Sequence, residues 1–164
     1  MRLTILPLLL PLLAGPALAA DPIPDALAAP GSVPVLTAHA EGEQLYDCKA
    51  GADGKLVWTF REPKATLIVD GKIAGKHYDG PTWELNDGST VVGKVVANVP
   101  GKTANDIAWL KLEVTAHRGS GTLADVATVQ RINTVGGKMG GPCDRAGDSR
   151  AMPYAADYVF LRKG

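Results

Sequence analysis

The segment ATLIVDGKIAGKHY, residues 65–78, decides the fold class because it contains two short strands joined by a tight turn. β-Branched and aliphatic residues run up to Val69, and a second strand follows from Lys72 to Tyr78. Between them, Asp70-Gly71 is a strong hairpin signal, since both residue types tolerate a positive φ angle. The segment predicts an antiparallel hairpin.

The same arrangement recurs along most of the chain. GADG at 51–54 precedes the strand KLVWTF, and TWELNDGSTVVGKVVANV at 82–99 has a turn at its NDG. Further strands are predicted within 107–118, 124–135 and 154–162. No window has apolar residues at helical spacing over three turns without an intervening glycine or β-branched cluster. With 19 glycines and 12 prolines between short strands, the chain is predicted to be all-β, one antiparallel sandwich or barrel. The sequence leaves the choice between these two open.

The N-terminal 20 residues, MRLTILPLLLPLLAGPALAA, have the layout of a secretory signal peptide. Arg2 precedes an apolar stretch, and Ala17-Leu18-Ala19 matches the A-x-A cleavage pattern. The alternative is a membrane anchor, but the apolar run is short and interrupted by prolines. We expect a periplasmic or secreted protein without stable membrane insertion, with a Pro/Ala-rich N-terminal arm over residues 21–40 and a β domain over residues 41–164.

The charge balance excludes two classes of partner. Without Arg2, the 17 basic residues become 16 against 17 acidic ones, a formal net charge of −1. Nucleic-acid binding needs a basic face, and anionic lipid attracts polybasic segments, so we expect neither partner. The remaining expectation is a monomer that binds an unidentified small molecule or a component of the cell envelope.

Cys48 and Cys143 are the only cysteines of the chain. In an oxidising compartment two cysteines usually pair, and no C-x-x-C or C-x-x-H spacing points to a metal. We therefore predict a disulfide, with two buried free thiols as the alternative.

The most chemically dense stretch is HYDGPTWELNDGS, residues 77–89. A triad of His77, Asp87 and Ser89 is conceivable, but no G-x-S-x-G motif surrounds the serine. Asp and Ser beside a glycine are more simply explained as hairpin-turn chemistry. Glu84 points to the opposite face of its strand from Trp83, which weakens a sugar-hydrolase interpretation of the carboxylates.

His77, Tyr78 and Trp83 flank the predicted DGP turn, which brings the two strand ends together. Tyr and Trp side chains stack on sugars and on other planar ligands. These three residues are therefore candidates for a binding site. The alternative is structural: Trp83 belongs to the core and His77 caps the end of the sheet by hydrogen bonding.

Histidines near the ends of three different predicted strands raise the question of a metal. A barrel can bring such positions together, and imidazole is a ligand for zinc and copper. The three have no H-x-H pair, so the signal is weak, and we expect no cofactor. The candidates are His39, His77 and His117.

A series of motifs resembles a family of secreted proteins, DUF3455, known from bacteria and filamentous fungi. The resemblance runs from about residue 42 to residue 160 and implies a single secreted domain without an established activity. It also places Cys48 and Cys143 at the cysteine positions of the family, which supports the disulfide. The motifs are LYDCKA, WTFREPKATL, HYDGPTWELNDGSTVVGKV, IAWLKLEV, VQRINTVGGK and PYAADYVF.

One of these motifs, QRINT at residues 130–134, is unusually polar for a strand. Strand alternation places Arg131 and Asn133 on one face. An arginine held on a sheet either pairs with a carboxylate, here Asp157, or faces a polar or anionic ligand.

The leading hypothesis is an exported, non-catalytic domain that binds a small polar, sugar-like or anionic ligand or an envelope component. The alternatives are a small metal-dependent enzyme that uses His77 or His117, and a purely structural envelope protein. The expected ligand-binding residues are His77, Tyr78, Trp83, Arg131 and Asn133.

Overall fold

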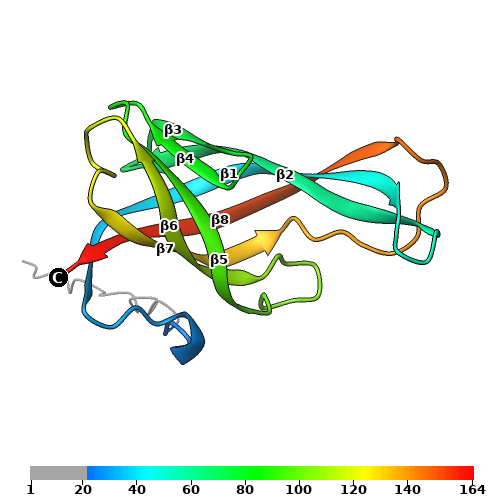
Figure 1. Cartoon of the computed structure of the whole chain (residues 1–164), viewed down its shortest axis with the longest axis horizontal. Helices are drawn as coiled ribbons and strands as arrows, with labels where there is room; N and C mark the ends of the chain where they lie inside the picture. The colour runs from blue at the N-terminus through cyan, green and yellow to red at the C-terminus, as the bar shows by residue number, and fades with distance from the viewer. Residues whose placement is uncertain (1–21) are drawn as a thin grey trace, which may run out of the picture.

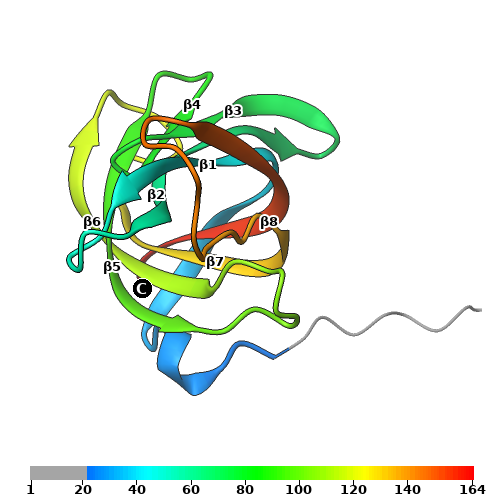
Figure 2. The same ribbon diagram turned by 90° about the vertical axis from the view of Figure 1, so that its right-hand side faces the viewer.

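The protein is a closed antiparallel β-barrel of eight strands, preceded by a 3-10 turn (Figures 1 and 2). The structure is a computed structural model that describes residues 22–164, so the predicted signal peptide lies outside the described residues. The elements are η1 (Asp25–Leu27), β1 (Ser32–Ala50), β2 (Leu56–Val69), β3 (Lys72–Tyr78), β4 (Thr82–Leu85), β5 (Thr90–Val99), β6 (Trp109–Arg118), β7 (Val126–Gly136) and β8 (Ser149–Lys163).

The first and last strands close the barrel. β1 and β8 pair from Ser32 with Lys163 to Asp47 with Ser149, and every other strand pairs with its neighbours in the sequence. Closure leaves no sheet edge along this seam. The all-β prediction is confirmed, and of its two architectures the chain adopts the barrel.

β1, β2 and β8 are longer than the barrel needs, and they project beyond it together with the loop at 137–148 (Figure 1). We call residues 46–60 and 137–150 the sheet extension. The sequence suggested separate strands at 55–60 and 65–69, whereas β2 is continuous from Leu56 to Val69. β3 pairs with β2 only from Ala65 onward, so Pro63 lies where β2 has one neighbouring strand and its missing N–H is tolerated.

The N-terminal arm is shorter than the predicted 21–40, because β1 begins at Ser32. Pro34 is accommodated at a register shift between Pro34 and Leu36. The remaining arm is held on the outside of the barrel, where Gln130 Nε2 donates to the carbonyl of Leu27 (2.7 Å) and Lys111 Nζ to that of Ala28 (3.1 Å). Among residues 22–164, no helix has the length and apolar character needed to cross a membrane.

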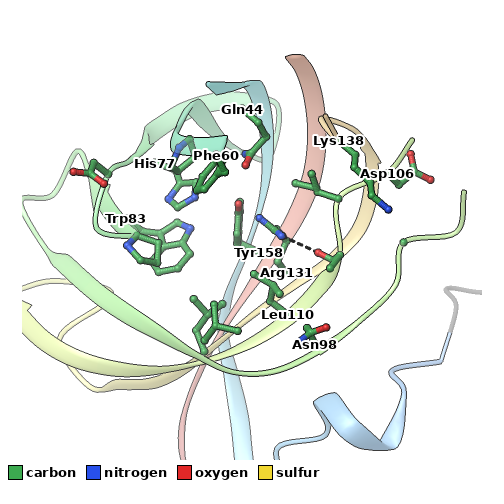
Figure 3. A pocket seen from close by; sticks show the side chains of 18 of the residues that line it. Gln44, Phe60, His77, Trp83, Asn98, Asp106, Leu110, Arg131, Lys138 and Tyr158 are labelled. Carbon is green, nitrogen blue, oxygen red and sulfur yellow. Dashed lines mark hydrogen bonds between the residues drawn. The ribbon is translucent and has the colours of Figure 1, made fainter. Parts of the chain in front are cut away.

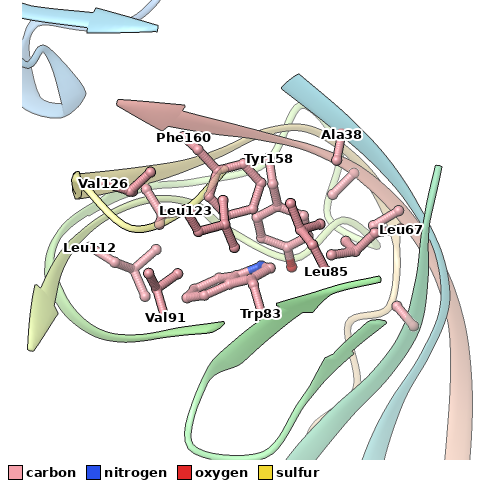
Figure 4. Packing of buried hydrophobic residues seen from close by; sticks show 14 of the residues in the cluster. Ala38, Leu67, Trp83, Leu85, Val91, Leu112, Leu123, Val126, Tyr158 and Phe160 are labelled. Atoms are coloured by element: carbon pink, nitrogen blue, oxygen red, sulfur yellow. The ribbon is translucent and has the colours of Figure 1, made fainter. Parts of the chain in front are cut away.

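One end of the barrel is filled by the apolar core, which includes Trp83, Val91, Leu123, Val126 and Phe160 (Figure 4). Leu123 is completely buried although it belongs to the β6–β7 connection. We call residues 119–125 the plug loop, because this side chain packs into the core between the surrounding strands. The plug loop thus closes that end of the barrel.

The polar turn at Asn86–Ser89 fixes the plug loop in place. Asp87 Oδ1 accepts hydrogen bonds from the Ser89 amide (2.9 Å) and hydroxyl (2.6 Å), and its Oδ2 accepts one from the Thr122 amide (2.8 Å). Ser89 Oγ in turn accepts from the Leu123 amide at 3.1 Å. The bonds from Ser89 and Thr122 favour the ionised carboxylate of Asp87 and hold its pKa below its usual range. The predicted hydrogen bonds of the turn are present, and the turn also anchors the plug loop.

Replacing Asp87 by Ala should lower the free energy of unfolding by about 2 kcal/mol, because the buried Ser89 and the plug-loop amide of Thr122 lose their acceptor. Urea denaturation measures the change. Asp53→Ala is the matched control, since Asp53 is exposed and accepts one backbone bond, from Lys55 within its own turn. The control should change stability by less than about 0.5 kcal/mol. Equal effects of the two substitutions would show that Asp87 does not anchor the plug loop.

Candidate functional site

A cavity of about 620 Å³ lies at the end of the barrel next to the sheet extension (Figure 3). Its deep wall is buried, whereas the rim carries exposed side chains, among them Phe60 (49% exposed) and Lys138. Cavities of this size hold small organic molecules in other proteins. The lining residues with side-chain rings or polar groups are Gln44, Tyr46, Phe60, Pro63, His77, Asp79, Pro81, Trp83, Asn98, Pro100, Asp106, Arg131, Lys138 and Tyr158.

His77 and Trp83 form a stacked pair in the deep wall. They are directly opposite each other on β3 and β4, which the turn between Tyr78 and Thr82 joins. The two ring centroids are 4.6 Å apart with an angle of 8° between the planes, and the Tyr158 ring lies 4.9 Å from the imidazole. Both residues are almost completely buried, and Trp83 belongs to the core, as the structural alternative held, while it also lines the cavity.

The hydrogen bond of His77 fixes its tautomer. Its Nδ1 lies 2.8 Å from the carbonyl oxygen of Thr82, which can only accept, so Nδ1 carries the proton and Nε2 is an acceptor. Burial lowers the pKa of His77 from 6.5 to about 3, against the effect of the Thr82 bond and with a further contribution from the positive charge of Arg131. The imidazole is therefore neutral at physiological pH.

Arg131 brings a positive charge into this apolar cavity. Its Nε and Nη2 donate to the carbonyl oxygen of Ala108, at 3.0 and 2.9 Å, which positions the guanidinium (Figure 3). Within residues 22–164 no carboxylate forms an ion pair with it. The alternative partner Asp157 instead binds His39 and Asn133. The nearby charge also opposes the rise that burial causes in the pKa of Tyr158.

The acidic residues of the cavity do not neutralise Arg131 directly. Asp106 Oδ1 accepts from the Gly136 amide (2.7 Å), and its Oδ2 accepts from the Thr103 amide and hydroxyl (2.9 and 2.8 Å). These bonds lower the pKa of Asp106 and hold its carboxylate toward the neighbouring loop. Asp79 is exposed at the rim.

The structure brings together three of the five predicted ligand-binding residues, namely His77, Trp83 and Arg131. Tyr78 follows His77 on the same strand and does not line this cavity; its hydroxyl donates to Glu84 Oε2 at 2.8 Å. Asn133 has a positive φ of 52° within the β7 bulge, and its amide donates to Asp157 Oδ2 at 2.8 Å. Arg131 and Asn133 therefore do not share one face of β7 as expected, because the bulge interrupts strand alternation.

The three histidines proposed as metal ligands have separate environments. His39 Nδ1 lies 2.8 Å from Asp157 Oδ1, while His117 Nε2 lies 2.7 Å from the carbonyl oxygen of Val126. His77 faces the cavity. Within the described part of the chain, no three His, Cys, Asp or Glu side chains are grouped so that they could hold a metal ion.

Sequence reasoning missed Gln44, Tyr46 and Tyr158. They come from the first and last strands, so no sequence spacing links them to His77. Gln44 is 2% exposed, and its Nε2 has no hydrogen-bond partner within residues 22–164; the same holds for Trp83 Nε1. A signal was present in EQLYDC, where alternation places polar Gln44 on the same face as Tyr46 and Cys48.

A family model covers residues 29–162, nearly all of the described chain. The chain belongs to the DUF3455 family. That family is described as proteins of unknown function. No curated protein and no solved structure matches the chain. Within the DUF3455 barrel, the cavity that contains Arg131 is the candidate site.

Proposed function

We propose that this DUF3455 protein is an exported, non-catalytic domain that binds a small anionic molecule with an apolar body in the barrel cavity. The observation that carries the proposal is the guanidinium of Arg131, which faces an apolar cavity without a carboxylate partner. Removing a charge from water is costly unless another charge compensates it. A carboxylate or similar anion would supply that compensation and would form charge-assisted hydrogen bonds with the guanidinium.

The lining of the cavity supports a ligand with an apolar body. Phe60, Leu110, Leu112 and the His77–Trp83 pair offer large apolar surfaces, and most of the exposed lining of the cavity is apolar. That combination is typical of small-molecule sites, in which apolar contact gives affinity and a few polar groups give orientation. The signal-peptide pattern and the disulfide support a place of action in the periplasm or outside the cell.

The alternative of a small metal-dependent enzyme that uses His77 or His117 gains no support from their surroundings, since within residues 22–164 neither belongs to a group of three His, Cys, Asp or Glu side chains that could hold a metal ion. His117 is hydrogen-bonded to Val126, beside the plug loop, whereas His77 lines the cavity at the other end of the barrel. The two side chains therefore belong to separate environments, and non-catalytic binding is the better-supported function.

Replacing Arg131 by Leu should weaken the binding of small acids roughly 10- to 100-fold, because the anion loses charge-assisted hydrogen bonds. The measurement is isothermal titration calorimetry with aromatic, aliphatic and sugar acids, each beside its methyl ester, which lacks the charge. Arg162→Leu is the matched control, since Arg162 is exposed on β8 and its side chain donates to the neighbouring Lys163 carbonyl. If esters bind as tightly as acids, or if Arg131→Leu binds like the unmodified protein, the proposal is wrong.

A further inference from the structure

Among the polar groups that line the cavity, His77 has the opposite hydrogen-bonding character to Arg131. His77 Nε2 is an acceptor, because the neutral imidazole carries its one proton on Nδ1, which donates to the Thr82 carbonyl. Arg131 offers only donors. A ligand that fits both must carry an acceptor or an anion at one position and an O–H or N–H donor at another.

The two groups lie on opposite walls. His77 belongs to β3 and Arg131 to β7, and these strands are four apart in either direction around the closed barrel. Both side chains line the same cavity (Figure 3). The acceptor and the donor group of the protein therefore reach a ligand from different strands, so the ligand must carry its donor and its anion at separate positions.

His77 is held rigidly in this role. Its ring stacks on Trp83, packs against Tyr158 and is tied by Nδ1 to the backbone of β4. Turning the ring over to present its N–H group to the cavity would break the hydrogen bond to the Thr82 carbonyl. Preorganised acceptors of this kind select a ligand by its donor, since a ligand without one leaves the acceptor unpaired.

The surface between these two groups is rich in aromatic rings. The chain contains only nine Phe, Trp and Tyr residues (two, three and four), and four of them line the cavity: Tyr46, Phe60, Trp83 and Tyr158. Aromatic side chains pair with other rings in offset or edge-to-face contacts. A sugar acid would carry hydroxyl groups all around its ring, and Leu110 and Leu112 could not bond them. A flat aromatic body fits this lining better.

We propose that the cavity binds a hydroxylated aromatic carboxylate, with the carboxylate on Arg131 and a hydroxyl group at the far end of the molecule donating to His77 Nε2. This inference rests on the proposed function, which requires only the anion and the apolar body. It adds the hydroxyl group, its position and the aromatic class. The buried amide of Gln44, which has no partner within residues 22–164, provides a further donor in the wall for an oxygen of such a ligand.

The test compares four probes by calorimetry on the purified, disulfide-bonded protein. They are 4-hydroxycinnamate, cinnamate, 2-hydroxycinnamate, in which the hydroxyl is beside the acid arm, and 4-vinylphenol, which lacks the carboxylate. We expect 4-hydroxycinnamate to bind roughly three- to tenfold more tightly than cinnamate, the gain from one neutral hydrogen bond. 2-Hydroxycinnamate should show no gain, and 4-vinylphenol should bind most weakly.

The outcomes separate the two proposals. Equal affinities of cinnamate and 4-hydroxycinnamate would overturn the inference and leave anion binding intact. Binding of 4-vinylphenol as tight as that of the acids, or no binding of any acid, would overturn both. Because this comparison uses unmodified protein, it does not depend on the folding of a variant.

Two further measurements assign the hydroxyl to His77. In ¹⁵N NMR spectra, the resonance of His77 Nε2 should shift on addition of 4-hydroxycinnamate but not of cinnamate. His77→Phe retains a ring beside Trp83 and should remove the difference between the two acids, whereas His39→Phe, on the exposed outer face, should retain it. A retained difference in His77→Phe would contradict the assignment.

Discussion

Replacing Cys48 and Cys143 together by Ala should lower the free energy of unfolding by about 4 kcal/mol. The disulfide joins residues 95 positions apart, and cross-linking a loop of that length restricts the unfolded chain strongly. The chain-entropy relation gives about 4–5 kcal/mol for such a loop. Domains of this size are typically stable by about 5–15 kcal/mol, so the loss would bring the protein close to unfolding.

The bond also joins the loop at 137–148 to β1 within the sheet extension. Beyond the barrel, β2 pairs with β1, and its other side is covered only by the loop that contains Cys143. There the Trp58 amide donates to the Gly141 carbonyl (3.0 Å), and the Cys143 amide donates to the Leu56 carbonyl (3.1 Å). These backbone bonds hold the loop weakly without the covalent link, so the extension should open first.

Urea denaturation of the double variant measures the global effect, and hydrogen exchange measures the local one. Amide protection should fall first at Trp58 and Cys143 and later in β3 to β6. Reduction of the unmodified protein should reproduce the result, which controls for the side-chain replacement itself. A double variant with unchanged stability and unchanged exchange at Trp58 would contradict this account.

The hairpins of the barrel could be predicted because their signals are local. Asp70 and Gly71 both have positive φ angles, of 50° and 73°, at the turn where the sequence placed them. Closure of the barrel could not be predicted, since it depends on pairs such as His39 with Asp157, 118 residues apart. A sandwich and a barrel share the same strand pattern and differ only in such distant pairs.

The candidate site could be predicted in part, because strand alternation is a local signal whereas contacts between distant strands are not. Strand alternation correctly assigned Trp83 and Glu84 to opposite faces, because no bulge lies between them. It failed at Asn133, where the bulge reorients the side chain, and it could not find Tyr158, which reaches the cavity from the last strand. A register change of one residue moves a side chain to the other face, so alternation holds only within unbroken ladders.

Between pH 7 and pH 4 the free energy of unfolding should fall by about 3 kcal/mol because of His77 alone. Burial lowers its pKa from 6.5 in the unfolded chain to about 3 in the folded protein. Between these values the unfolded state binds a proton that the folded state does not, so acidification favours unfolding. The stabilisation is complete above about pH 6.5 and is lost as pH falls toward 3, at about 1.4 kcal/mol per pH unit.

The contributions of Asp87 and Asp106 fall in a separate pH range. The pKa of each carboxyl is held low by hydrogen bonds in the folded protein. Their stabilisation is therefore present above the unfolded value of about 4 and is lost at more acidic pH. Between pH 4 and pH 6.5 the decrease from His77 can be measured with little contribution from these two carboxyls.

Urea denaturation at half-unit pH steps gives the slope of the free energy of unfolding against pH directly. His77→Phe should be less stable than the unmodified protein at pH 7, because it leaves the Thr82 carbonyl without its partner, yet its stability should depend less on pH between 6.5 and 4. His39→Phe is the control, since His39 is exposed on the outer face and its loss should leave the His77 contribution in place. A steep slope that survives in His77→Phe would show that another group takes up the proton. A shallow slope in the unmodified protein would show that the imidazole is charged within the cavity, in which case Nε2 could not accept a hydrogen bond from a ligand hydroxyl.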